Sequence, residues 1–254
     1  LENVAARRLG FEGMNALADF VTERGGGLLM TGGRASFGIG GYHLSAIDEL
    51  LPVSMEMREE HRKLGVALGL VLDRSGSMGA EVGGGRTKMD LANAGASAAI
   101  EMLSNIDSVA VLAVDSGPHT VVPLEPVVDH ASITGRVRRI RSEGGGIFTY
   151  NGLAAAGELL IEADQDNKHI VLFADAADAE QQEGVPELLD QFAEFGITVS
   201  VIALGTEDDQ HADFLFQVAE LGGGDVYFTT HPEELPRLFA QDTLTVARST
   251  FIEE

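Results

Sequence analysis

The sequence has no cysteine, little lysine and no long hydrophobic run. Without cysteine, this stretch forms no disulfide, no zinc–thiolate site and no thiol nucleophile. Lysine and arginine together number 17 against 40 aspartates and glutamates, and the net charge is −23. Such a charge argues against a nucleic-acid partner, because a phosphate backbone would be repelled. The longest apolar runs have only the length of a strand, so we expect no membrane span here.

The remaining composition is typical of a soluble globular protein, with 44% hydrophobic and 22% charged residues, and the length suggests one or two domains. The excess of acid fits a high-salt habitat, divalent cation binding or simple solubility. The sequence begins at Leu1 without an initiator methionine or a signal-peptide pattern. We therefore expect a piece of a longer protein, with any membrane anchor outside it.

Short apolar runs alternate with amphipathic stretches of helix length along most of the chain. The runs are nearly continuous Val, Ile, Leu and Ala, which is typical of parallel strands covered on both faces. The expected strands are Gly27–Met30, Leu64–Leu72, Ser108–Val114, His169–Ala174, Thr198–Leu204 and Asp225–Thr229. The expected helices are Lys88–Ser104, Tyr150–Ala163, Pro186–Phe195, Asp209–Leu221 and Pro232–Val246.

This alternation predicts an α/β fold: a doubly wound, mostly parallel sheet with helices on both faces. The stretch Ser108–Val122 differs, because two apolar runs flank the turn sequence DSGPH. It predicts a hairpin that adds one antiparallel edge strand to the sheet.

The segment VLDRSGSMG, residues 71–79, carries an acid and two hydroxyls at alternating positions just where a buried strand is expected to end. Ligands of open parallel sheets bind outside the carboxyl ends of the strands. Asp73, Ser75 and Ser77 supply only oxygen donors, which hard cations such as Mg²⁺ prefer. Three side chains cannot fill six coordination positions, so further oxygens must come from other loops.

Two other loops offer such oxygens at equivalent strand ends. In SEGGGIFTYNGL, three glycines precede Thr149 at the start of an expected helix, and in HIVLFADAADAE, Asp175 follows a continuous apolar strand. Taken one at a time, these residues also suit ordinary roles: serines in turns and threonine as a helix cap. Asp178 is a weaker candidate ligand that suits a capping role. Arg74, inside the first motif, is expected to face solvent.

The order D-x-S-x-S, then T, then D resembles the von Willebrand factor A (vWA) domain with its metal-ion-dependent adhesion site, over roughly residues 62–240. The resemblance implies that Ser75, Ser77 and Thr149 contact the metal through their hydroxyls. Asp73 and Asp175 would act mainly through bound water and by orienting those hydroxyls. The ion would be Mg²⁺, or alternatively Mn²⁺ or Ca²⁺. A partner protein's Asp or Glu would complete its coordination.

The vWA resemblance also implies a setting. Such domains work beside AAA+ ATPases or in membrane-bound complexes, so we expect a larger bacterial, membrane-associated parent with its membrane segments outside this piece. We place the vWA domain at residues 61–254, with a boundary near Glu59–Arg62, and its last helix can lead into a further domain.

Residues 1–60 carry a second resemblance. The stretch LADFVTERGGGLLMTGGRASFGIGGYHLSAIDELLPVSM resembles part of the class I glutamine-amidotransferase-like, flavodoxin-like domain that accompanies vWA domains in certain bacterial membrane-associated proteins. Its late βα unit would be a helix at Met14–Arg24 and a strand at Leu28–Met30. A working glutaminase needs a cysteine nucleophile, so we expect a structural or interaction role for this segment.

The competing functional class is an enzyme. An aspartate directly after a buried strand is also the nucleophile of Mg²⁺-dependent phosphotransferases and hydrolases, which would give Asp73 that role. Those enzymes carry D-x-D, whereas residue 75 is serine here. SGSMG does not match G-x-S-x-G, and GGGRTK does not match a phosphate-binding loop. We therefore expect a non-catalytic, metal-dependent protein-binding domain.

Overall fold

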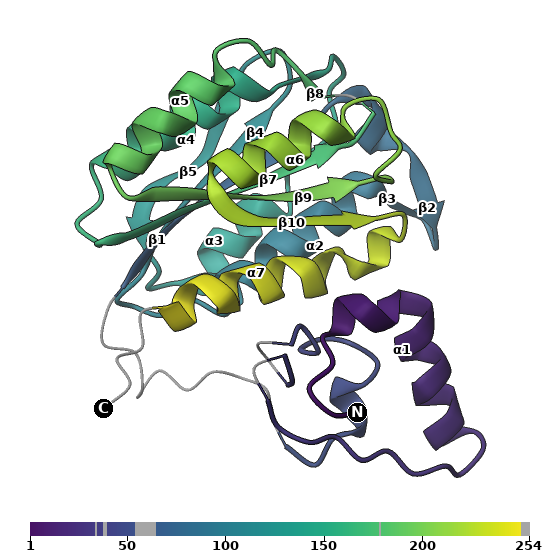
Figure 1. Cartoon of the computed structure of the whole chain (residues 1–254). Helices are drawn as coiled ribbons and strands as arrows, with labels where there is room; N and C mark the ends of the chain where they lie inside the picture. The colour runs from purple at the N-terminus through teal and green to yellow at the C-terminus, as the bar shows by residue number, and fades with distance from the viewer. Residues whose placement is uncertain (34, 38–39, 54–64, 178, 250–254) are drawn as a thin grey trace.

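The computed structural model describes residues 1–33, 35–37, 40–53, 65–177 and 179–249, and its main body is a six-stranded sheet between two layers of helices (Figure 1). The strand order is β10-β9-β7-β1-β4-β5, and all neighbours are parallel except the β4–β5 edge pair. The strands are β1 (Val66–Asp73), β4 (Ser108–Val114), β5 (Pro118–Pro126), β7 (Asn167–Asp175), β9 (Ile197–Leu204) and β10 (Gly223–Thr229).

Both faces of this sheet are buried, which explains the nearly continuous apolar strand sequences. On β1, Leu68, Leu70 and Leu72 point into one core, whereas Ala67 and Val71 point into the other. Successive side chains of a strand point to opposite faces of the sheet, so one apolar strand contributes to both cores. The first core packs under α2 (Lys88–Glu101), α3 (His130–Val137) and α7 (Leu235–Ser249), and the second under α4 (Thr149–Ile161), α5 (Val185–Glu194) and α6 (Ala212–Leu221).

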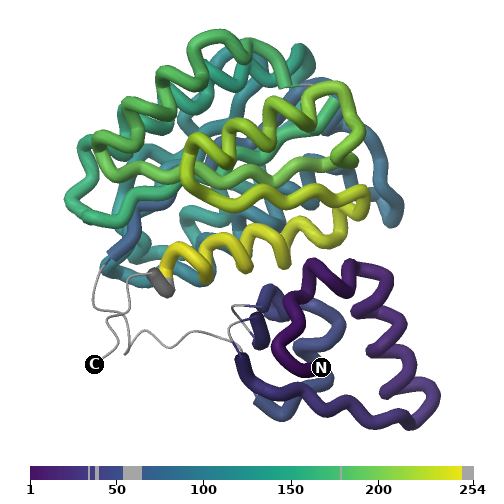
Figure 2. The backbone as a smooth tube through the Cα atoms, viewed as in Figure 1, coloured from purple at the N-terminus to yellow at the C-terminus, as the bar shows by residue number. Residues whose placement is uncertain are grey.

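The central strand β1 lies where the direction of winding reverses. From β1 the chain passes through α2 to β4 and β5 on one side, and then through α3 and α4 to β7, β9 and β10 on the other (Figure 2). The carboxyl ends of β1, β4 and β7 therefore meet at a topological switch point, where open α/β sheets form their ligand sites. The expected doubly wound sheet and its antiparallel edge hairpin are confirmed.

Several short elements were not anticipated. The two-residue strands β6 (Ile147–Phe148) and β8 (Ala179–Glu180) pair with each other, and β2 (Glu81–Gly83) pairs with β3 (Arg86–Thr87). These segments, like α3, are too short or too polar to give a periodic signal. No helix in the described part of the chain is long and apolar enough to cross a membrane.

The described residues of the segment 1–53 form a small unit built from helix α1 (Ala6–Thr22), the 3₁₀ turn η1 (Asp48–Leu50) and irregular chain. Its core contains Ala6, Met14, Tyr42 and Ile47. The strand expected at Gly27–Met30 is wrong: these residues have no regular structure, and the nearby pairing is a single bridge between Glu2 and Thr31. Three consecutive glycines, at positions 25–27, overlap the start of that run and disfavour extended pairing.

The helix expected at Met14–Arg24 starts earlier, at Ala6, and includes a kink at Gly10, whose φ is +67°. The domain boundary expected near Glu59–Arg62 lies outside the described residues. The resemblance of residues 1–60 to an amidotransferase-like domain stays a prediction.

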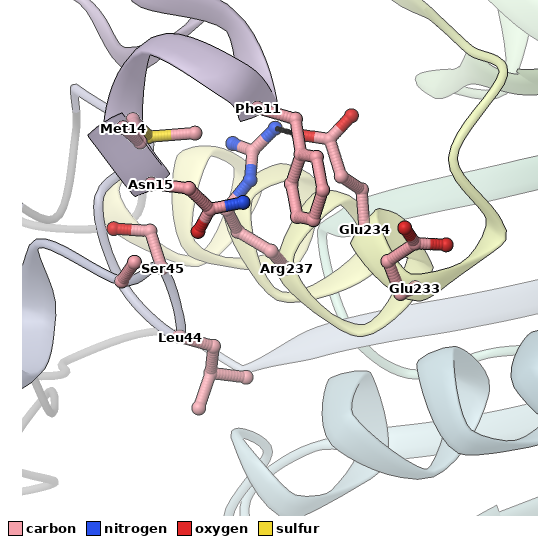
Figure 3. Close-up of a pocket in the computed structure, with 9 residues that line it drawn as sticks. Phe11, Met14, Asn15, Leu44, Ser45, Glu233, Glu234 and Arg237 are labelled. Atoms are coloured by element: carbon pink, nitrogen blue, oxygen red, sulfur yellow. Dashed lines mark hydrogen bonds and ion pairs between the residues drawn. The ribbon is translucent and has the colours of Figure 1, made fainter. Parts of the chain in front are cut away.

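This N-terminal unit contacts helix α7 through one buried arginine (Figure 3). The Nη1 of Arg237 donates to the carbonyl of Gly41 at 2.9 Å and to Gln241 Oε1 at 3.0 Å, and its Nη2 pairs with Glu234 at 2.8 Å. Arg237 is only 7% exposed. Nearby, the ring of Phe11 stacks on His231 at a centroid distance of 4.8 Å. A buried charge with three partners is an expensive group to disturb.

Replacing Arg237 with methionine should therefore lower the free energy of unfolding by about 3 kcal/mol, because Glu234 is left buried without its cation. Urea denaturation of the purified chain measures this. The matched control is Arg139→Met, at an exposed site, which should change stability by less than about 0.5 kcal/mol. Equal denaturation midpoints for the two variants would mean that Arg237 does not anchor the N-terminal unit.

Candidate metal centre

Asp73, the last residue of β1, joins two of the loops at the switch point. Its side chain is 0% exposed. Oδ1 accepts the backbone N–H of Ser75 at 2.7 Å, and Oδ2 accepts the backbone N–H of Asp175 at 3.1 Å. A carboxylate with both oxygens engaged by amides of different loops fixes the two loops relative to each other.

The two serines of the motif come together in a single turn after β1. Ser75 is 0% exposed, and a 3₁₀ turn over Gly76–Gly79 follows it. This turn brings the Oγ of Ser77 to 3.1 Å from the Oγ of Ser75. The hydroxyls expected to act together thus form a pair.

The glycine-rich loop before α4 closes over this turn. Gly145 accepts the backbone N–H of Gly76 at 3.1 Å, and Ser142 Oγ donates to the carbonyl of Ser75 at 2.6 Å. Gly144 and Gly145 have φ values of +100° and +80°, a region that side chains disfavour. The glycines that the local backbone requires are therefore in this second loop, because Gly76 and Gly79 do not have positive φ.

Thr149 opens helix α4 with a buried and unpaired hydroxyl. The residue is 0% exposed, and its Oγ1 has no hydrogen-bond partner in the described structure. One turn later, Gly152 packs so closely on Val71 and Val114 that an added Cβ would lie 3.0 Å from each. The start of α4 therefore lies over the carboxyl ends of β1 and β4. Burying a hydroxyl without a partner costs about 1–3 kcal/mol, so its retention calls for a ligand or another explanation.

Asp175 supplies the third loop and is 7% exposed. Its Oδ1 accepts the backbone N–H of Ala177 at 3.1 Å, and its Oδ2 accepts a hydrogen bond from the ammonium of Lys88 at 3.1 Å. Lys88 was not expected at the site from the sequence, because it lies 87 residues away and in no motif with Asp175. Asp178 lies outside the described residues.

The second and third loops are also tied to each other. Ile147 and Phe148 pair with Ala179 and Glu180 in the β6–β8 ladder. Gln181 then caps α4: its carbonyl accepts the N–H of Tyr150 at 3.3 Å, and its Oε1 accepts that of Asn151 at 3.2 Å. Each of the three loops is thus hydrogen-bonded to both of the others, which holds the side chains in place before any ligand binds.

Arg74 does not face solvent, so that expectation is wrong. Its side chain is 12% exposed and forms ion pairs with Asp115 at 2.6 Å and with Glu143 at 3.3 Å. The two carboxylates attract the guanidinium into the rim between the loops after β1, β4 and α3. Arg74 therefore braces the loops and does not reach outward to steer a ligand.

Burial dominates the electrostatics of the site. It raises the pKa of Asp73 from 3.8 to about 6, against the hydrogen bonds from Ser75 and Asp175, while the charge of Asp175 raises it further. At Asp115, burial also acts to raise the pKa, but hydrogen bonds from His119, Arg74 and Gly117 outweigh it and the pKa is lowered. An ionised Asp73 is thus an unfavourable buried charge that a nearby cation would stabilise.

The donor set fits a hard divalent ion. It combines three hydroxyls and two carboxylates, from Asp73, Ser75, Ser77, Thr149 and Asp175. In the described ranges, no group of three or more His, Asp or Glu side chains is placed to hold a metal. Any ion here therefore depends on the hydroxyls, and the unpaired Oγ1 of Thr149 is the observation that supports one.

Residues 68–177 match the family model of the von Willebrand factor type A domain. The matched stretch contains all five candidate residues. A search of curated proteins found no match.

Solved structures show the same fold. BatB from Bacteroides thetaiotaomicron is 20% identical with a TM-score of 0.59, covering 72% of this chain and 100% of its own. A von Willebrand factor type A protein from Catenulispora acidiphila is 26% identical with a TM-score of 0.61, covering 72% and 43%. Proximal thread matrix protein 1 from the mussel byssus, with zinc in its MIDAS motif, is 15% identical with a TM-score of 0.61, covering 73% and 47%. The chain thus matches less than half the length of the last two.

The raised pKa of Asp73 predicts a specific pH dependence of the stability of the chain with a chelator present. Below pH 3.8 the carboxyl is protonated in both folded and unfolded chains, and above about 6 it is ionised in both. Between these values the unfolded chain loses its proton first, so stability falls as pH rises. Relative to Asp73→Asn, the wild type should lose about 2 kcal/mol between pH 4 and pH 7.

Urea denaturation at several pH values measures this difference. Asp115→Asn provides the opposite case, because the lowered pKa of Asp115 makes the wild type gain stability relative to that variant as pH rises. A flat or rising curve for the Asp73 pair would contradict the burial argument.

Proposed function

We propose that the vWA domain binds one divalent cation at the switch point and uses it to grip a carboxylate of another protein. The observation that carries this proposal is the buried, unpaired hydroxyl of Thr149 at the strand ends where Asp73, the Ser75–Ser77 pair and Asp175 are tied together. The ion is Mg²⁺, with Mn²⁺ and Ca²⁺ as alternatives.

In this proposal each residue has a defined task. The hydroxyls of Ser75, Ser77 and Thr149 are the direct ligands, which are neutral and leave the charge of the ion largely uncompensated. Asp73 and Asp175 orient those hydroxyls and balance charge through bound water. An ion held by neutral oxygens still attracts an anionic one, so an Asp or Glu from a partner completes its coordination.

The alternative of an Mg²⁺-dependent phosphotransferase or hydrolase gives Asp73 the role of nucleophile. A nucleophile needs an oxygen free to approach its substrate. The side chain of Asp73 is 0% exposed, and both of its oxygens accept backbone N–H groups. This favours an orienting role, and we infer a binding domain without catalytic activity.

Thr149→Val tests the metal proposal with little structural change. Valine keeps the shape and removes the hydroxyl, so Mg²⁺ affinity measured by isothermal titration calorimetry should fall at least about tenfold. Stability in a chelator should stay equal or rise, because an unpaired buried hydroxyl is removed.

Thr134→Val is the matched control. Thr134 is also buried, at 3% exposure, but its hydroxyl donates to the carbonyl of His130 at 2.8 Å. This variant should lose stability, by roughly 1 kcal/mol, and keep its Mg²⁺ affinity. The metal proposal is wrong if Thr149→Val binds Mg²⁺ as the wild type does.

The partner is tested by capture from the native organism with and without EDTA, using Thr149→Val as the second arm. A metal-dependent partner is retained by the wild type and lost in EDTA and in the variant. Replacing its contacting Asp or Glu with alanine should then abolish retention. An AAA+ ATPase or a membrane-complex component stays a prediction for its identity. Turnover of p-nitrophenyl phosphate that Asp73→Asn abolishes would favour the enzyme alternative.

A further inference from the structure

Lys88 places a positive charge directly on one of the site's two carboxylates. Its Nζ lies 3.1 Å from Asp175 Oδ2, and the two side chains are 25% and 10% exposed. No other basic side chain among the described residues pairs with Asp73 or Asp175, and Arg74 is engaged by Asp115 and Glu143. Lys88 thus supplies the positive charge that pairs with this carboxylate in the structure.

The local structure holds Lys88 at this place. It is the first residue of α2, and its backbone N–H donates to the carbonyl of Ala80 at 3.0 Å. Thr87 and Asp90 form a reciprocal capping box around the same turn. The position is unfavourable for a lysine, because the amino end of a helix carries partial positive charge. The ion pair with Asp175 explains why a lysine is tolerated at the start of helix α2.

A divalent ion held next to Asp175 would repel the ammonium of Lys88. The water that links the ion to Asp175 would also need the carboxylate that the ammonium now holds. The lysine stem is flexible and the side chain is one-quarter exposed, so the ammonium can turn towards solvent when an ion binds. Releasing it costs the energy of the partly buried ion pair. Ion binding must supply that energy.

We propose that Lys88 competes with the divalent ion for Asp175 and so sets the ion concentration at which the site fills. The inference rests on the proposed metal site. Lys88 would lower affinity for the ion while stabilising the domain without it. The domain would then bind its partner only above a threshold of free divalent cation.

Isothermal titration with MgCl₂ of the wild type and Lys88→Met tests this directly. Methionine keeps much of the length of the side chain and removes its charge. One unit charge at this distance shifts ionic equilibria by one logarithmic unit or more, so the variant should bind Mg²⁺ about tenfold more tightly. Lys88→Arg keeps the charge and should bind within about twofold of the wild type.

Lys168→Met is the matched control, because it removes the same charge at the other end of the sheet. Lys168 lies at the amino end of β7, and its Nζ donates to the carbonyl of Ile161 at 3.0 Å. Lys168 lies seven positions before Asp175 along the strand, which is about 23 Å and well beyond the screening length of about 8 Å in physiological salt. Its Mg²⁺ affinity should equal that of the wild type.

Thermal unfolding provides a second readout. In EDTA, Lys88→Met should melt below the wild type, and saturating Mg²⁺ should raise its melting temperature by more. If the wild type binds Mg²⁺ and a folded Lys88→Met binds it equally or more weakly, the competition proposal is wrong and the metal site stands. Absence of binding by the wild type overturns the metal site itself, and the competition with it.

Discussion

The carboxylate of Asp73 is the group on which the arrangement of the site depends. It ends the central strand, and its two oxygens accept amides from its own loop and from the loop after β7. Because these hydrogen bonds are buried, water does not compete for them, and the two loops share one geometry. The cost is a buried charge, visible in the raised pKa of Asp73.

The loops around Asp73 form a closed set of contacts. The carbonyl of Gly145 accepts the N–H of Gly76, and Gln181 caps helix α4, which Thr149 begins. The backbone N–H of Asp175 donates to the carboxylate of Asp73. The ligands that we propose therefore have little conformational freedom to lose on binding an ion. In our proposal Lys88 opposes ion binding, because its ammonium already pairs with Asp175.

Much of the domain could be predicted because its signals are local. Continuous apolar strands, amphipathic helices and a glycine-containing turn led to the correct sheet, and the spacing of Asp73, Ser75 and Ser77 indicated a loop of oxygen donors. The pairing of Lys88 with Asp175 and the inward turn of Arg74 could not be predicted, because both depend on which loops the fold brings together. The strand expected at Gly27–Met30 is wrong because its apolar run is short and no strand in the described part of the chain lies beside it.

The most direct measurement is an anomalous difference map from crystals of the chain grown with Mn²⁺. We expect one strong peak at bonding distance from the hydroxyl oxygens of Ser75, Ser77 and Thr149, with Asp73 and Asp175 around it. A map with no peak at the end of β1, or with the ion bound away from Thr149, would contradict it.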